Sequence, residues 1–307
     1  MLGPIGVIGG GTAGRGIARV FAQAGVDVVL VEASDHHLEA SLEALRDAMD
    51  RDIARWSITE AERDAVLARI QGRVSLEGVC GLEVVVEAIQ EDRKDKAALL
   101  WELDRSSAPG TVFITNTSTL SVTGLAAALT PARRPYLVGL HFLHPVTRVQ
   151  AVELVRGRET GPEAVAVVRE MAELLDKELI EVSEYPGYIT SRLTLGFINE
   201  AVHTLMEGVG TRDAIDRAMK LRFGSSFGPL ALADEMGLDS LVRALDSLWS
   251  ELGLPQYRPC PLLRQMVRRG LLGEKSGRGF YRYDESGARI VEGDPDLGRP
   301  ELDSFLE

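Results

Sequence analysis

The sequence predicts an α/β protein in which a doubly wound, mostly parallel sheet is followed by an all-α C-terminal domain. Short apolar runs alternate with helical patterns up to about residue 185, which is the order of repeated strand–helix–strand units. Beyond that point only helical periodicity continues. A chain of 307 residues is long enough to bury two separate cores. We therefore expect a first domain over 1–185, a helical domain over 186–284 and an acidic tail over 285–307.

The first expected element is a strand that leads into a glycine-rich turn. Residues Ile5–Ile8 are apolar, and the turn after them carries the pattern G-x-G-x-x-G before a helical pattern begins. A second apolar run, Val26–Val31, ends in an acidic residue. The first glycine permits the turn, the second lets a pyrophosphate approach the backbone, and the third lets the helix pack against the strand. This arrangement predicts a dinucleotide site formed by Gly9, Gly11, Thr12, Ala13, Gly14 and Glu32.

Glu32 indicates which dinucleotide binds. A carboxylate at this position accepts hydrogen bonds from both ribose hydroxyls, whereas a 2′-phosphate would meet a like charge. The next residues, Ala33-Ser34-Asp35, contain no arginine that would offset this repulsion. The sequence therefore predicts NAD rather than NADP as the cofactor.

Residues 35–70 are highly charged and helical, which predicts two long helices as an excursion between the second and third strands. The arginines in this excursion fit a solvated face with i,i+4 ion pairs. The elements expected next are strands near Val74–Leu76 and Glu83–Ile89, a helix over about Asp92–Arg105 and a strand at Val112–Thr115.

The strand at 112–115 runs into small polar residues, Asn116-Thr117-Ser118-Thr119. Ligands commonly bind at the carboxyl edge of a parallel sheet, where such side chains lie. Asn116 and Ser118 are therefore candidate ligand contacts. The pattern alone fits plain turn or cap residues equally well.

The stretch from Leu137 to Val155 contains two apolar runs broken at Pro145, which predicts two buried strands. Each run carries one ionisable residue, His141 in the first and Glu153 in the second. A carboxylate beside an imidazole fixes the tautomer of the ring and stabilises the imidazolium, as a general base requires. The other interpretation is a structural histidine and an unrelated glutamate at a strand end, and the pattern alone leaves both open.

The remaining elements are a helix, a strand and then helices only. We expect them at about Pro162–Leu175, Leu179–Val182, Ile189–Met206, Thr211–Lys220, Leu238–Leu252 and Pro261–Arg269. The apolar stripe of the helix at 189–206 is wide for one packing partner, so part of it is expected to face another subunit.

Composition argues against several classes of function. The net charge of −12 disfavours nucleic acid as a partner, because phosphate backbones bind basic surfaces. No stretch has the length and apolar character of a membrane-spanning helix, and no leader pattern precedes the first strand, so no membrane contact is expected. Cys80 and Cys260 lie far apart and fit no metal-ligand spacing, which predicts no metal site and a reducing, cytoplasmic location.

Seven short motifs follow one another along the chain between about residues 3 and 284. They are Gly9-Gly10-Gly11-Thr12-Ala13-Gly14-Arg15-Gly16-Ile17-Ala18, Val86-Glu87-Ala88-Ile89, Asn116-Thr117-Ser118, Gly139-Leu140-His141-Phe142, Pro186-Gly187-Tyr188, Gly228-Pro229-Leu230 and Lys275-Ser276-Gly277-Arg278-Gly279-Phe280-Tyr281. With these motifs the chain resembles the 3-hydroxyacyl-CoA dehydrogenases, in particular the short bacterial 3-hydroxybutyryl-CoA dehydrogenases. The resemblance implies a Rossmann-type domain, a helical domain that binds substrate and forms a homodimer, and NAD-linked oxidation of the 3-hydroxyl of an acyl thioester.

The resemblance also implies roles for individual residues. His141 matches the catalytic base of the family, Glu153 its partner, and Ser118 the serine that holds the substrate oxygen. The positions that match the nicotinamide end of the cofactor site are Glu91, Lys96 and Asn116.

Two positions depart from the family pattern. His144 and Ser191 each stand where relatives carry an asparagine, and the asparagine at the position of Ser191 helps to hold the substrate there. The excursion also lacks the lysines that many relatives use for coenzyme A phosphates. The expected reaction is the reversible oxidation of a 3-hydroxyacyl thioester to the 3-oxoacyl thioester.

Two alternative functions remain. The same chemistry would suit a carrier-protein-bound or 2-substituted 3-hydroxyacyl group, as in enzymes that make polyketide extender units. The chain would otherwise be a non-catalytic dinucleotide-binding protein, although such a protein gains little from a buried charged pair.

Overall fold

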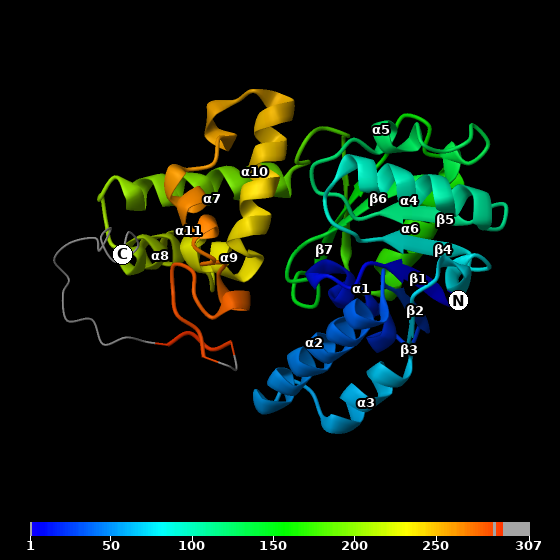
Figure 1. Cartoon of the computed structure of the whole chain (residues 1–307), viewed down its shortest axis with the longest axis horizontal. Coiled ribbons are helices and arrows are strands. Elements are labelled where there is room, and N and C mark those ends of the chain that lie inside the picture. The colour runs from blue at the N-terminus through cyan, green and yellow to red at the C-terminus, as the bar shows by residue number, and fades with distance from the viewer. Residues whose placement is uncertain (1, 285–286, 291–307) are drawn as a thin grey trace. The chain divides into compact units, whose positions relative to one another are not determined.

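The computed structural model describes residues 2–284 and 287–290. The chain divides into two compact units, Met1–Tyr188 and Ile189–Glu307 (Figure 1). The tail expected over 285–307 lies outside the described residues, apart from 287–290.

The first unit is built on one sheet of eight strands, in the order β3-β2-β1-β4-β5-β6-β7-β8. The strands are β1 (Ile5–Ile8), β2 (Val28–Val31), β3 (Ile70–Arg73), β4 (Val84–Glu87), β5 (Val112–Thr115), β6 (Leu137–Phe142), β7 (Ala151–Val155) and β8 (Glu178–Val182). Neighbouring strands run parallel except β6 and β7, which are antiparallel. The strand order reverses between β1 and β4, so the expected doubly wound fold is confirmed. In such sheets ligands bind beyond the carboxyl ends of the strands at that reversal.

Helices cover both faces of this sheet (Figure 1). They are α1 (Thr12–Gln23), α2 (Asp35–Ala54), α3 (Glu60–Ala68), α4 (Arg93–Ser106), α5 (Val122–Ala126) and α6 (Pro162–Leu174), with 3₁₀ helices η1 (Leu76–Val79) and η2 (Arg134–Tyr136). Successive side chains of a strand point to opposite faces, so Val86 enters the core under α1, α2 and α6. Val85 enters the other core, under α4 and α5.

The excursion differs in two ways from its prediction. The third strand was expected near Val74–Leu76, but it is β3 at Ile70–Arg73, and Leu76–Val79 forms a 3₁₀ helix. β3 is an edge strand in which only Ile70 is buried, so it lacks the apolar run by which strands are recognised. The second helix, α3, has nine residues and is not long.

The second unit has a separate core formed by its helices. The helices are α7 (Thr190–Met206), α8 (Arg212–Phe223), α9 (Pro229–Met236), α10 (Leu238–Leu252) and α11 (Pro261–Arg268), with η3 (Pro255–Tyr257) and η4 (Glu274–Ser276). The sequence prediction missed α9. It was also wrong in expecting only helices, because isolated bridges such as Gly273 with Arg278 form near the end of the described chain.

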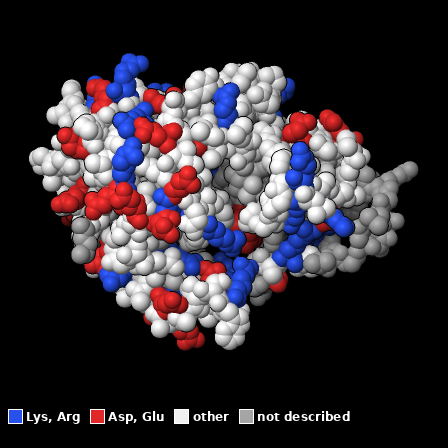
Figure 2. All heavy atoms as spheres, turned by 180° about the vertical axis from the view of Figure 1, so that it is seen from behind, with Lys and Arg blue, Asp and Glu red and all other residues white. Residues whose placement is uncertain are grey.

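Acidic and basic side chains are interspersed on the face drawn in Figure 2. In the part of the chain that the structure describes, no helix is both long and apolar enough to cross a membrane.

Candidate active site

The turn between β1 and α1 has a shape that admits a pyrophosphate group. Gly9 has φ +96°, and a Cβ there would lie 2.8 Å from the carbonyl oxygen of Ala88. A Cβ at Gly14 would lie 1.7 Å from the carbonyl oxygen of Gly9, so only glycine lets α1 come this close to the turn. At Gly11, the N-cap of α1, a Cβ would meet no atom within 4 Å. The backbone amides at the start of α1 are therefore open to a phosphate group.

Thr12 and Ala13 form the start of α1 and keep part of their surface exposed beside this open space. Their backbone amides belong to the first turn of the helix, where N–H groups have no partner within the helix. The residues present thus fit a bound dinucleotide phosphate.

Glu32 follows β2 directly, and its carboxylate contacts the glycine-rich turn. Its Oε1 accepts hydrogen bonds from the backbone nitrogen of Gly10 (2.7 Å) and from the hydroxyl of Ser41 (2.9 Å). Arg15 donates to the carbonyl oxygen of Gly10 at 2.7 Å. Burial lowers the pKa of Arg15, the charge of Glu32 raises it, and the charge of Arg51 lowers it further. One arginine, Arg15 of α1, therefore acts on Glu32, although residues 33–35 supply none.

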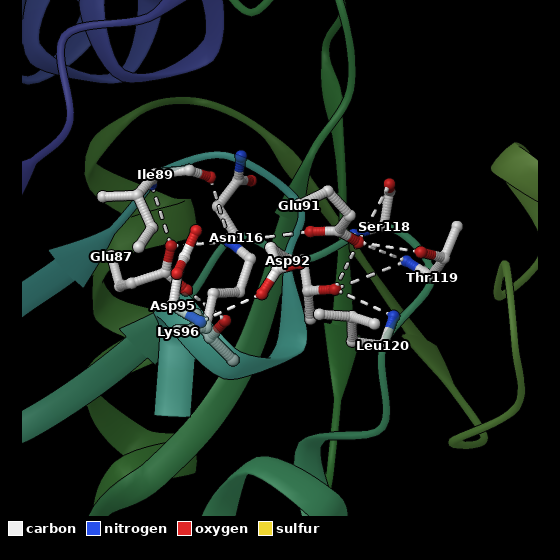
Figure 3. Close-up of polar contacts among 12 residues, drawn as sticks. Glu87, Ile89, Glu91, Asp92, Asp95, Lys96, Asn116, Ser118, Thr119 and Leu120 are labelled. Atoms are coloured by element: carbon white, nitrogen blue, oxygen red, sulfur yellow. Dashed lines mark hydrogen bonds and ion pairs between the residues drawn. The ribbon is translucent and has the colours of Figure 1, made fainter. Parts of the chain in front are cut away.

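β4 ends in Glu87, whose carboxylate forms a buried ion pair with Lys96 of α4 (Figure 3). The Nζ–Oε1 distance is 2.6 Å, and both side chains are 1% exposed. Glu87 also accepts from the backbone nitrogen of Ile89 (2.9 Å) and the hydroxyl of Thr115 (2.7 Å). Lys96 donates in turn to the carbonyl oxygen of Ile89 at 3.1 Å. Both charges are therefore paired and hydrogen-bonded inside the fold, as burial requires.

Glu91 holds the loop that follows β5, which carries Ser118 (Figure 3). Its Oε1 accepts from the hydroxyl of Thr117 (2.6 Å) and from the backbone nitrogens of Ser118 (2.9 Å) and Thr119 (2.8 Å). Its Oε2 lies 3.5 Å from Nζ of Lys96. Burial alone would raise the pKa of Glu91, but the charge of Lys96 and these hydrogen bonds leave it below the ordinary value. Glu91 is therefore ionised at neutral pH and fixes the backbone around Ser118.

Asn116 joins the end of β5 to β6. Its Oδ1 accepts a hydrogen bond from the backbone nitrogen of Phe142 at 2.8 Å. The carbonyl oxygen of this side chain thus serves the fold, and the amide nitrogen is a donor that a ligand can use.

His141 and Glu153 face each other across β6 and β7. They are register partners, and the distance from Nδ1 to Oε2 is 2.7 Å. His141 is 8% exposed and Glu153 is fully buried, at 0%. An ionised carboxylate can only accept a hydrogen bond, so we assign the proton to Nδ1, which leaves the lone pair of Nε2 to accept another. This is the geometry of a general base with an orienting carboxylate.

Ser118 and His141 lie at the same edge of the sheet. β5 pairs in parallel with β6, with Thr115 opposite Gly139, and both residues follow these positions toward the carboxyl ends. Ser118 keeps part of its surface exposed between two buried threonines.

The two positions that depart from the family pattern lie in different units. His144 follows β6, and its pKa is lowered by burial and then by the positive charge of Arg148, so the ring is neutral at pH 7. Ser191 lies in the first turn of α7 in the second unit and is partly exposed.

Sequence reasoning missed the residues that close the cluster around Lys96 and Glu91, namely Glu87, Thr115, Thr117 and Thr119. Glu87 carried a usable signal, because it ends an apolar run as Glu32 does. The threonines carried none, since the partner of Thr117 lies 26 positions away along the chain.

Comparison with known proteins places this geometry in a family. Residues 4–185 match the NAD binding domain of 3-hydroxyacyl-CoA dehydrogenase, and residues 187–283 match its C-terminal domain. A probable 3-hydroxybutyryl-CoA dehydrogenase of Bacillus subtilis is 41% identical over 279 residues, which cover 91% of this chain and 96% of that protein. The mitochondrial hydroxyacyl-coenzyme A dehydrogenase of Sus scrofa is 34% identical over 286 residues, which cover 90% of this chain and 90% of that protein.

Solved structures agree with these matches. The crystal structure of FadB2 from M. tuberculosis has a TM-score of 0.85 and 34% identity, covering 92% of this chain and 99% of that chain. The (S)-3-hydroxybutyryl-CoA dehydrogenase of Ralstonia eutropha has a TM-score of 0.77 and 37% identity, covering 93% and 100%. The chain therefore belongs to the 3-hydroxyacyl-CoA dehydrogenase family, and its first domain is the NAD binding domain of that family.

Proposed function

We propose that this chain oxidises the 3-hydroxyl of a 3-hydroxyacyl thioester to the 3-oxoacyl thioester, reversibly and with NAD. The observation that carries the proposal is the paired His141 and Glu153 at the carboxyl edge of a sheet whose first turn admits a pyrophosphate. The relatives named above, from Bacillus subtilis and Ralstonia eutropha, are 3-hydroxybutyryl-CoA dehydrogenases by name. We therefore choose 3-hydroxybutyryl-CoA as the first substrate to test.

Three side chains have separate roles in the proposed reaction. Nε2 of His141 takes the proton of the 3-hydroxyl group. When bound, NAD would supply the acceptor for the hydride that leaves C3. Glu153 keeps the ring in the required tautomer and stabilises the imidazolium that forms. Ser118 donates a hydrogen bond to the substrate oxygen. General-base catalysis of this kind contributes about 10²–10⁴-fold to the rate, and positioning of the reactants adds to it.

The cofactor site combines backbone and side-chain groups. The turn formed by Gly9, Gly11, Thr12, Ala13 and Gly14 receives the pyrophosphate at the start of α1. Glu32 accepts from the ribose hydroxyls. We assign the nicotinamide end to Glu91, Lys96 and Asn116, whose contacts within the fold support a role in shaping that end of the site.

The test is to follow NADH formation with a panel of 3-hydroxyacyl-CoAs of different chain length and one carrier-protein-bound analogue. The proposal expects turnover with at least one thioester and loss of turnover in His141→Gln. A protein that binds NAD but forms no NADH with any of these thioesters would contradict it.

A second candidate keeps this chemistry and changes the acyl group. Ser191 is shorter than the asparagine of relatives, which leaves room for a bridging water or for a substituent at C2. Ser191→Asn should then gain on unbranched 3-hydroxybutyryl-CoA and lose on a 2-substituted analogue, by about threefold to tenfold in kcat/KM for one hydrogen bond. Equal effects on both substrates would remove Ser191 as a determinant of specificity.

We also propose that the helical unit forms a homodimer. Large apolar side chains stand exposed on and around α7 and α8, among them Leu193, Val209, Leu221 and Phe223. Phe197 and Phe223 pack edge to face at 5.9 Å on this surface. A second copy of the chain would cover it, and sedimentation of Leu193→Glu against the unaltered protein tests this.

The two cysteines are free, which suits the proposed cytoplasmic location.

A further inference from the structure

The loop that carries Ser118 is anchored at both ends. Glu91 holds its first half through Thr117, Ser118 and Thr119. Its second half is held from a segment far away in the sequence, where the hydroxyl of Tyr188 donates to the carbonyl oxygen of Leu120 at 3.0 Å. Leu120 is two residues from Ser118, so this bond limits the movement of the serine.

Tyr188 is itself held rigidly. It is 5% exposed and belongs to the core formed by α4, α5 and the sheet. Its φ is +47°, a conformation that non-glycine residues rarely adopt and that persists only where surrounding contacts determine it. Its backbone nitrogen donates to the carbonyl oxygen of Tyr185 at 2.9 Å. A side chain fixed in this way can serve as an anchor for a loop.

The ring of Tyr188 also lies beside the ring of His141. The two ring centroids are 5.9 Å apart, at an interplanar angle of 57°. One residue therefore contacts the imidazole through its ring and the loop of Ser118 through its hydroxyl. Through these two contacts Tyr188 connects His141 with the loop of Ser118, and these are the two residues that act on the substrate oxygen in the proposed reaction.

A second anchor comes from the same segment. Glu184 accepts from the hydroxyl of Ser121 (2.9 Å) and from the backbone nitrogen of Thr123 (2.6 Å).

Burial, with the charges of Glu91 and Glu184, raises the pKa of Tyr188 well above its ordinary value. The phenol therefore keeps its proton and remains a donor throughout the pH range of an assay.

We propose that Tyr188 is a positioning residue that fixes Ser118 and His141 relative to each other. The inference rests on the function proposed above, since it assigns Tyr188 a role through those two residues. A tyrosine that only filled the core would stabilise the domain without acting through Ser118. The two roles differ in kinetics, because only a positioning role depends on Ser118 being present.

The experiment is a double-mutant cycle of Tyr188→Phe and Ser118→Ala, with kcat, KM for the thioester and NAD affinity measured for all four proteins. Tyr188→Phe removes the hydroxyl and keeps the ring beside His141. We expect it to lower kcat about threefold to tenfold, as for the loss of one hydrogen bond, with little change in KM or NAD affinity. In the Ser118→Ala background the same change should alter kcat less than about twofold. Tyr136→Phe, which removes a hydroxyl from the same unit away from the site, is the matched control and should match the unaltered enzyme.

The outcomes separate this inference from the proposed function. Unchanged kcat in Tyr188→Phe, or an equal loss with and without Ser118, would overturn the positioning role while Ser118→Ala still lowers turnover. If the unaltered protein oxidises no thioester, or if Ser118→Ala has full activity, the proposed function or the role of Ser118 fails, and the positioning role fails with it.

Discussion

Two buried charged pairs lie in the same sheet, and their surroundings differ. Lys96 and Glu87 are 2.6 Å apart, and His141 and Glu153 are 2.7 Å apart. In the first pair both partners make further hydrogen bonds inside the fold. In the second, Nε2 of His141 has no hydrogen-bond partner within the residues that the structure describes. The first pair is thus closed and supports the loops around it, whereas the second leaves one atom that can exchange a proton with a substrate.

The largest expected effect comes from removing Nε2 of His141, the ring atom without a hydrogen-bond partner in the described residues. His141→Gln keeps a side chain that can hydrogen-bond Glu153 but cannot accept a proton as a base. Turnover should fall about 10²–10⁴-fold, measured as the rate of NADH formation. NAD affinity, measured by titration calorimetry, should stay the same, because the ring does not belong to the phosphate or ribose site. A loss of NAD affinity as large as the loss of turnover would contradict this assignment.

Breaking the closed pair should instead affect stability. Lys96→Met leaves Glu87 buried without its counter-charge, which should lower the free energy of unfolding by about 3–5 kcal/mol. Lys94→Met, at an exposed lysine of the same helix, is the control and should change it by less than about 0.5 kcal/mol. Urea unfolding followed by circular dichroism measures both. Equal effects of the two substitutions would show that burial of the pair does not matter.

These two pairs also show what the sequence can predict. Strands β1, β5 and β6 and the glycine-rich turn follow local patterns, so they could be predicted, whereas the roles expected for His141 and Glu153 came from the resemblance to the family. The pairing of His141 with Glu153 depends on strand register, which the sequence left open. The closure around Lys96 and the bond from Tyr188 to Leu120 depend on contacts between distant residues, the latter 68 positions apart. β3 was misplaced because an edge strand needs no apolar run.

A third carboxylate, Glu32, extends the comparison because it directly follows β2, whereas Glu87 ends β4, and because it is only half-buried. If it receives the ribose hydroxyls, NADP should bind about 10²-fold more weakly than NAD, since like charges in contact cost a few kcal/mol. Glu32→Gln should narrow this difference in affinity, because the repelling carboxylate is gone and the positive charge of Arg15 remains nearby. Isothermal titration with both nucleotides measures it. Comparable affinities for NAD and NADP in the unaltered protein would refute the assignment.

The smallest expected effect concerns pH and the closed cluster. The pKa of Glu91 lies below its ordinary value of 4.5 in the folded protein, because Lys96 and the hydrogen bonds of its loop outweigh burial. The ionised form is thus favoured by folding, so Glu91 contributes stability above pH 4.5 that is lost as the pH falls through its folded-state pKa. Glu91→Gln should reduce this acid-dependent loss in urea unfolding measured at successively lower pH. An identical pH dependence in the two proteins would exclude the contribution.

The most direct test of the central claim, that His141 and Glu153 act as one unit, is a double-mutant cycle on turnover. The proteins to compare are the unaltered enzyme, His141→Gln, Glu153→Gln and the double variant, each saturated with NAD. Glu153→Gln should lower kcat, because the imidazole loses its orienting partner and the imidazolium its counter-charge. The double variant should be little worse than His141→Gln alone, as is usual for residues that work together. Losses that multiply across the two substitutions would mean that the residues act separately, which would contradict a general base built from the pair.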